Sequence, residues 1–182
     1  MKQIFKKRRG FSLLEITLAL AIAITIAAGG FTVYKKAQSS QRAEREARNI
    51  ATIKAGVRSL YGGKSNYEGL VNQVAIEAHI IPDNMLVPGS MRQIVSSYGG
   101  QVTVYASDYG ITKGPNSSFT IIYAGVPDED CVKLVPPVVG DLSAAKVNNT
   151  RVKEIGGVLD LDALTTACSE GKNKNQLNLS TL

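Results

Sequence analysis

Residues 10–34 of this 182-residue chain read GFSLLEITLALAIAITIAAGGFTVY. Glu15 is the only charged residue in this stretch, and none is charged from Ile16 to Tyr34. An uncharged apolar run of about 20 residues is long enough to span the hydrocarbon core of a bilayer as a helix. The stretch therefore predicts a helix whose surface faces lipid or other apolar helices.

Residues 1–10 are strongly basic and contain no acid. The basic residues are Lys2, Lys6, Lys7, Arg8 and Arg9. Such a cluster holds the preceding end of a membrane helix in the cytoplasm, so the rest of the chain is expected on the other side. Without these five, the 21 basic residues fall to 16 against 15 acidic residues, a balance of +1. This near neutrality argues against nucleic acid as a partner.

The helical pattern continues beyond Tyr34 in more polar sequence. A stripe recurs at three- and four-residue steps, formed by Ala43, Ala47, Ile50, Val57 and Tyr61 with Lys54 as its one polar member. Opposite charges alternate on the other positions, which are expected to be solvated: Arg42, Glu44, Arg45, Glu46 and Arg48. Gly62 and Gly63 follow as a stop signal. These features predict one helix over 11–61, whose second half covers a folded domain.

Residues 62–182 are expected to form that domain, with an α+β fold in which the long helix packs on an antiparallel sheet. The β-branched and aromatic runs 102–106 and 119–124 predict neighbouring antiparallel strands. Shorter elements are expected as helices over 71–79, 91–97 and from Asp128 to about Leu134, and as an edge strand over 152–160. The Asn-rich stretch 172–178 is expected to be a flexible surface segment.

Cys131 and Cys168 are the only cysteines. An even count in a chain that starts like an exported protein favours one disulfide formed outside the cytoplasm. Two buried free thiols are the alternative.

The motif Gly10-Phe11-Ser12-Leu13-Leu14-Glu15, between a basic segment and an apolar helix, resembles the processing and assembly motif of type IV pilins and their pseudopilin relatives. The resemblance implies that 1–10 is a leader peptide, that a prepilin peptidase cuts between Gly10 and Phe11, and that the new amine of Phe11 is methylated. A secretory signal peptide cut near Ala27-Ala28-Gly29 is the competing interpretation, and the acid at Glu15 argues against it.

Glu15 is costly where it stands. An ionised acid at the centre of a membrane helix costs about 3 kcal/mol, and such residues usually mark function. The resemblance implies a partner for it, the amine of Phe11 on an adjacent subunit, so that Glu15 is an assembly residue. A side chain that merely reaches the membrane edge is the alternative.

Further matches resemble the type IVb branch of the pilins: the segments 81–85 and 97–104, and the two cysteines. In that branch the cysteines close a variable carboxy-terminal region on the filament surface, which corresponds here to 131–168 within the pilin head. The ten-residue leader and Phe11 as the first mature residue depart from that branch. Both departures concern the subclass.

The resemblance implies a non-enzymatic structural subunit with the type IV pilin fold. It would be anchored once in the inner membrane, amino end in the cytoplasm, and then polymerise with copies of itself into an extracellular pilus for adhesion, aggregation, motility or conjugation. Its other implied partners are the prepilin peptidase and the inner-membrane pilus assembly machinery. The alternative is a pseudopilin of a type II-like secretion system, which a calcium site would favour. No cofactor or metal is expected, because His79 is the only histidine and only Glu77 stands near it at a helical spacing.

Overall fold

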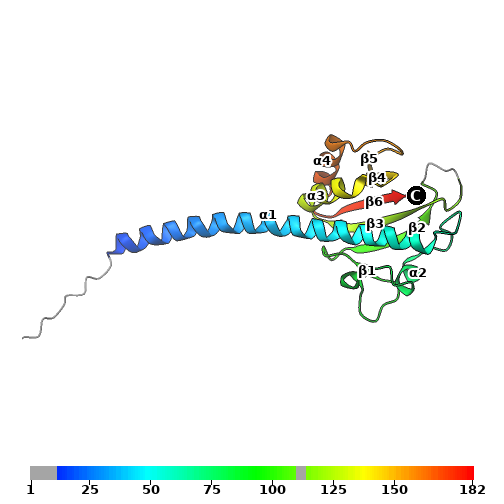
Figure 1. The fold of residues 1–182 in the computed structure, drawn as a ribbon. Coiled ribbons are helices and arrows are strands. Elements are labelled where there is room, and N and C mark those ends of the chain that lie inside the picture. Colours follow the sequence, from blue (N-terminus) through cyan, green and yellow to red (C-terminus); the bar gives the residue numbers. More distant parts are fainter. Residues whose placement is uncertain (1–11, 110–113) are drawn as a thin grey trace, which may run out of the picture. The chain divides into compact units, whose positions relative to one another are not determined.

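The computed structural model describes residues 12–109 and 114–182, without the side chains of residues 27, 28, 31 and 32. In chain order the elements are α1 (Leu13–Leu60), α2 (Asn72–Glu77), the 3-10 helix η1 (Asp83–Met85), β1 (Ile94–Val95), β2 (Gln101–Ser107), β3 (Ser118–Val126), α3 (Asp128–Val139), β4 (Ala144–Val147), β5 (Thr150–Lys153), α4 (Leu161–Glu170) and β6 (Asn175–Thr181) (Figure 1). The predicted α+β fold is confirmed. Contacts divide the chain into two units, one that ends at Gln38 and one that comprises Ser39–Leu182.

The first unit contains the first half of α1. Every side chain described between Ser12 and Gln38 is exposed. The hydroxyls of Thr17 and Thr25 donate to the backbone carbonyls of Leu14 and Ile22 at 2.9 and 2.8 Å, so these polar groups are satisfied within the helix. Among the described residues, no helix contains a segment long and apolar enough to cross a membrane.

The second unit is built around a six-stranded antiparallel sheet with the strand order β1-β2-β3-β6-β4-β5. The strands predicted over 102–106 and 119–124 are β2 and β3, and they pair as neighbours, with Val104 opposite Ile121. The carboxy-terminal strand β6 lies between β3 and β4. The two parts of the sheet, β1-β2-β3 and β4-β5, are therefore joined only when β6 is in place.

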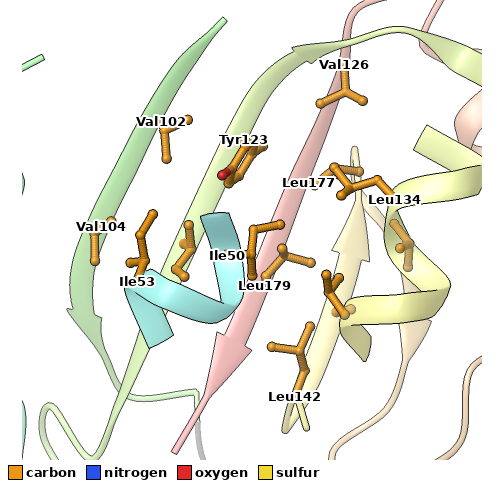
Figure 2. Close-up of a cluster of buried hydrophobic side chains, with 14 of the residues drawn as sticks. Ile50, Ile53, Val102, Val104, Tyr123, Val126, Leu134, Leu142, Leu177 and Leu179 are labelled. Atoms are coloured by element: carbon orange, nitrogen blue, oxygen red, sulfur yellow. The ribbon is translucent and has the colours of Figure 1, made fainter. Parts of the chain in front are cut away.

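One face of this sheet forms the core with the second half of α1 and with α3. Two rows of paired residues run across the strands on this face: Val102, Tyr123, Leu177 and Val147, and next to them Val104, Ile121, Leu179 and Ala145. Figure 2 shows Ile50 and Ile53 of α1 against these rows and Leu134 of α3 beside them. All three are fully buried. Because side chains alternate along a strand, the intervening residues lie on the opposite face.

Several local expectations are corrected by the structure. No helix forms over 91–97, where Ile94 and Val95 make the edge strand β1 instead. The edge strand at the other side, β5, ends at Lys153 rather than near 160. The prediction of a flexible segment over 172–178 is wrong, because the residues from Asn175 onward belong to β6. The helix that begins at Asp128 continues to Val139 through Pro136 and Pro137. Pro127, rather than Asp128, occupies its N-cap position.

The turn that leads into β2 depends on two glycines. Gly99 has a φ of +78°, a conformation that only glycine adopts without strain. A Cβ on Gly100 would lie 1.7 Å from the carbonyl oxygen of Ala124, so no side chain fits there. The turn holds Ser97 and Tyr98 beneath α1, where they meet a buried acid of the helix.

Candidate functional site

The predicted processing residues Gly10 and Phe11 lie outside the described residues. Glu15 lies in the first turn of α1 with an exposed side chain, and its backbone N–H donates to the carbonyl of Ser12 at 3.0 Å. A helix amino end carries a partial positive charge that favours a nearby carboxylate. The structure thus places the acid at the start of the apolar surface, where a partner from outside the chain can reach it.

The apolar surface that follows Glu15 is continuous around the helix. At 100° per residue its large side chains point in every direction, and all of them are exposed: Leu13, Leu14, Ile16, Leu18, Leu20, Ile22, Ile24 and Ile26. A helix that is apolar on all sides is buried in its working environment, and an exposed apolar surface of this extent marks an interaction site. We call residues 13–26 the apolar segment.

The second half of α1 is held at its start by a buried acid of α3. Asp130 is 1 % exposed, and its carboxylate accepts hydrogen bonds from the Ser39 hydroxyl at 2.7 Å and from the Arg42 guanidinium at 3.3 Å. The Lys133 ammonium donates to the same Ser39 hydroxyl at 2.8 Å. This charged cluster joins the helix to the start of the disulfide-bounded region.

One turn further along, Glu46 is fully buried. Its carboxylate accepts from the backbone N–H of Ser97 at 2.7 Å and from the Asn49 amide at 3.2 Å. Burial, together with the charges of Asp130 and Glu46, raises the pKa of Tyr98, whose hydroxyl is buried without a hydrogen-bond partner among the described residues. The tyrosine therefore stays neutral and faces two acids from the glycine turn.

The placement of Glu46 on a solvated face was wrong. Glu46 and Asn49 are in helical phase with Ala43, Ile50 and Ile53, all buried, so the buried stripe is wider and more polar than apolar residues alone indicate. The helical spacing of Glu46 and Asn49 from the buried apolar residues was the sequence signal that could have predicted their burial. The expected polar member of the stripe, Lys54, is also buried, and its ammonium lies 3.6 Å from the Asp141 carboxylate. Burial lowers the pKa of Lys54 more than the charge of Asp141 raises it.

A disulfide joins Cys131 of α3 to Cys168 of α4, in agreement with the pairing implied for the head. Both cysteines are buried, and the bridge closes a separation of 37 residues. The end of α3 is held as well, because the buried Lys153 ammonium donates to the carbonyl of Val139 at 2.8 Å. A cation at the carboxyl end of a helix is favourable.

Two of the three acids at the start of α3, Asp128 and Asp130, bind partners within the protein, whereas Glu129 is exposed. The Asp128 carboxylate accepts hydrogen bonds from the Asn173 backbone N–H at 2.7 Å and from the Asn175 side-chain amide at 2.8 Å. The Asp130 carboxylate accepts from Ser39 of α1. Within residues 12–109 and 114–182, no group of three or more His, Cys, Asp or Glu side chains is placed to hold a metal ion. No observation on these residues favours the calcium site that a pseudopilin would carry.

Comparison with known proteins connects these features to a family. The model of the family described as PilS N terminal matches residues 40–182, which is most of the chain and includes the sheet, the disulfide and the buried half of α1. The chain belongs to the PilS family.

Relatives of this PilS-family chain include the major structural subunits of the bundle-forming pilus from Escherichia coli O127:H6 (strain E2348/69 / EPEC) and Escherichia coli O111:H-. Each is 28 % identical over 99 residues, which cover 54 % of this chain and 51 % of the relative. The chain thus spans about half the length of the curated relatives it matches.

The crystal structure of TcpA, a type IV pilin from Vibrio cholerae El Tor biotype, is similar in fold, with a TM-score of 0.50 at 14 % identity. The match covers 80 % of the PilS-family chain and 99 % of TcpA. The fold is therefore that of a type IV pilin, and the chain is a type IV pilin of the IVb-like branch.

Proposed function

We propose that this pilin is the structural subunit of a type IV pilus, a non-enzymatic protein that polymerises with copies of itself into an extracellular filament. The observation that carries the proposal is the uncovered apolar segment of α1. Its side chains have no partner among the described residues, and they continue in the same helix into a folded pilin head. Apolar helices from neighbouring copies supply the missing cover in the filament, where each fully buried side chain is stabilised by about 1.5–3 kcal/mol relative to exposure to water.

Electron microscopy of cells that carry or lack the gene tests this function. Filaments should be present with the gene, absent without it, and restored when the gene is returned. Antibodies against the head should label the filaments along their whole length. Filaments of normal number and appearance in cells without the gene would contradict the role of structural subunit.

Maturation is a second part of the proposal. A prepilin peptidase removes residues 1–10 by cutting between Gly10 and Phe11 and methylates the new amine. The motif from Gly10 to Glu15 and its place before the apolar segment support this step, because a cut there leaves the helix in the product. Mass spectrometry of filament protein should find N-methylated Phe11 as the first residue. A chain that starts at Met1 or near Gly30 would contradict it.

Before assembly, the chain is held in the inner membrane by residues 16–34 with its amino end in the cytoplasm, where the assembly machinery meets it. The charge-free run and the basic residues before it support this orientation. Cell fractionation tests it. The full chain should sediment with membranes, whereas a truncated protein that begins at Ser39, the start of the second unit, should be soluble, folded and disulfide-bonded. Recovery of the full chain in the soluble fraction would contradict the anchor.

Glu15 is proposed to set the register of assembly. Its carboxylate pairs with the amine of Phe11 on the adjacent copy, so that the two charges enter the apolar bundle together. The exposed position of Glu15 in the first turn supports this role. Pairing is required because a buried charge that loses its partner costs about 3–5 kcal/mol.

A further inference from the structure

The face of the sheet opposite the core carries a groove lined by both polar and apolar side chains. Its floor consists of the residues that alternate with the core rows, and strand pairing brings Tyr105 opposite Thr120 and Lys146 opposite Asn178. The groove has a volume of about 310 Å³, within the range of small-molecule sites. It crosses β2, β3, β6 and β4, and it is lined by tyrosines, hydroxyls, amides and one lysine together with Ile122, Ala144 and Ala145.

The hydroxyls of the floor satisfy one another. Ser107, Thr120 and Ser180 form a chain of hydrogen bonds across three strands, each 2.9 Å long. Nearer the rim, the Gln176 amide donates to the Asn178 carbonyl oxygen at 3.2 Å. Among the described residues, the side-chain oxygen of Gln176 and the side-chain nitrogen of Asn178 have no protein partner. An acceptor and a donor therefore remain for a ligand with hydroxyl groups.

Two cations meet at the tyrosine that borders the groove. The Lys146 ammonium lies 4.9 Å from the centre of the Tyr109 ring, and the Arg151 guanidinium carbon lies 5.5 Å from it. Arg151 also hydrogen-bonds the Tyr109 hydroxyl and is paired with Glu154 at 2.7 Å. No acid of the described residues pairs with Lys146. Hydrogen bonding by Lys146 lowers the pKa of Tyr109, against the opposing effect of burial.

We propose that this groove binds an acidic saccharide, with a sugar ring on the tyrosines, its hydroxyls on Gln176 and Asn178, and its carboxylate on Lys146 and Arg151. Aromatic rings and planar amides fit the alternating C–H faces and hydroxyls of a sugar. The lysine supplies a charge-assisted hydrogen bond to a carboxylate. Nucleic acid is disfavoured, because phosphate backbones are bound by rows of cations, whereas one lysine lines this groove and Arg151 lies beside it against Tyr109.

The test titrates the full-length protein in detergent with trigalacturonate and sialyllactose by isothermal titration calorimetry. The controls are the methyl esters of both sugars, which keep the sugar rings and lack the charge. We expect the acidic sugars to bind at least about 10-fold more tightly than their neutral counterparts, the effect of one hydrogen bond to a charged group. The preference should weaken in high salt.

Two matched variants locate the site. Lys146→Gln should lose most of the preference for the acidic sugars. Lys64→Gln removes another lysine that lies over a tyrosine ring, 5.1 Å from the centre of Tyr61, and should leave binding unchanged. Three results would overturn the proposal: neither acidic sugar binds, neutral and acidic sugars bind alike, or Lys146→Gln and Lys64→Gln behave alike. Equally tight binding of a short single-stranded oligonucleotide would show general attraction of anions and would overturn it too.

Discussion

Ile24 and Ile50 belong to the same helix, yet the first is 67 % exposed and the second is fully buried. The difference extends to the polar residues of the two halves. The acid of the first half, Glu15, is exposed, whereas Glu46 in the second half is buried with two donors. The second half is covered by its own chain, whereas the side chains of the first half are exposed among the described residues. In the proposed function, one helix therefore carries a folding surface followed by an assembly surface.

The sharpest test of this comparison replaces one acid in each half of α1 by Ala. Glu15→Ala should abolish filaments, because the Phe11 amine would enter the bundle unpaired at a cost of about 3–5 kcal/mol. Glu44→Ala is the matched control, since Glu44 is an exposed acid of the second half whose pair with Arg48 at 3.8 Å is worth little. Filament counts by electron microscopy give the result, and Glu15→Asp should restore part of the yield. Normal filaments from Glu15→Ala would leave Glu15 without a role in assembly.

The disulfide tests whether the head is stable independently of the apolar segment. Replacing both Cys131 and Cys168 by Ser should lower the free energy of unfolding of the head by about 4 kcal/mol, as expected for a separation of 37 residues. Urea denaturation measures this change. A reducing agent should destabilise the wild type by a similar amount and leave the double variant unaffected. A loss of less than about 1 kcal/mol would mean that the packing of α3 and α4 suffices.

A pair of identical substitutions compares packing in the two halves. Ile50→Ala should destabilise the head by about 2–5 kcal/mol, because it leaves a cavity between α1 and the sheet. Ile24→Ala should change head stability by less than about 0.5 kcal/mol, while reducing filament yield. Urea denaturation of the full chain in detergent and filament counts measure the two effects. If both variants reduced head stability equally, the division of α1 would be wrong.

The smallest expected effect concerns Lys54, the buried cation of the second half. Lys54→Met should be neutral or stabilise the head by about 1 kcal/mol, because it removes a desolvated charge and leaves Asp141 exposed. The folded pKa of Lys54 lies below the unfolded value of 10.5. Between these two values the unfolded state binds more protons, so the stability of the wild type should rise with pH through that window. The variant should lack this rise.

Urea denaturation of both proteins at several pH values up to about 10.5 isolates the contribution of Lys54, because the remaining lysines are shared. A loss of more than about 1 kcal/mol in Lys54→Met at neutral pH would show that attraction to Asp141 outweighs the cost of burial.

The sequence by itself determined the features that depend on neighbouring residues. The charge-free run after Glu15 predicts an apolar helix from composition alone, and the runs that became β2 and β3 predict strands from their β-branched and aromatic residues. These two strands are consecutive in the sequence, so their antiparallel pairing was predicted together with them. The family resemblance also rested on consecutive residues at the start of the chain.

The tertiary structure decided what depends on distant partners. Residues 172–178 were predicted to be a flexible surface segment, but from Asn175 they belong to β6 (Asn175–Thr181), which is polar at every second position. It becomes a central strand because β3 and β4 satisfy its backbone on both sides, and its leucines face the core. Glu46 is likewise buried where donors reach its carboxylate, among them the Ser97 N–H that the glycine turn brings to it. The central position of β6 and the burial of Glu46 both depend on hydrogen-bond partners that are distant in sequence. The local sequence does not identify these partners.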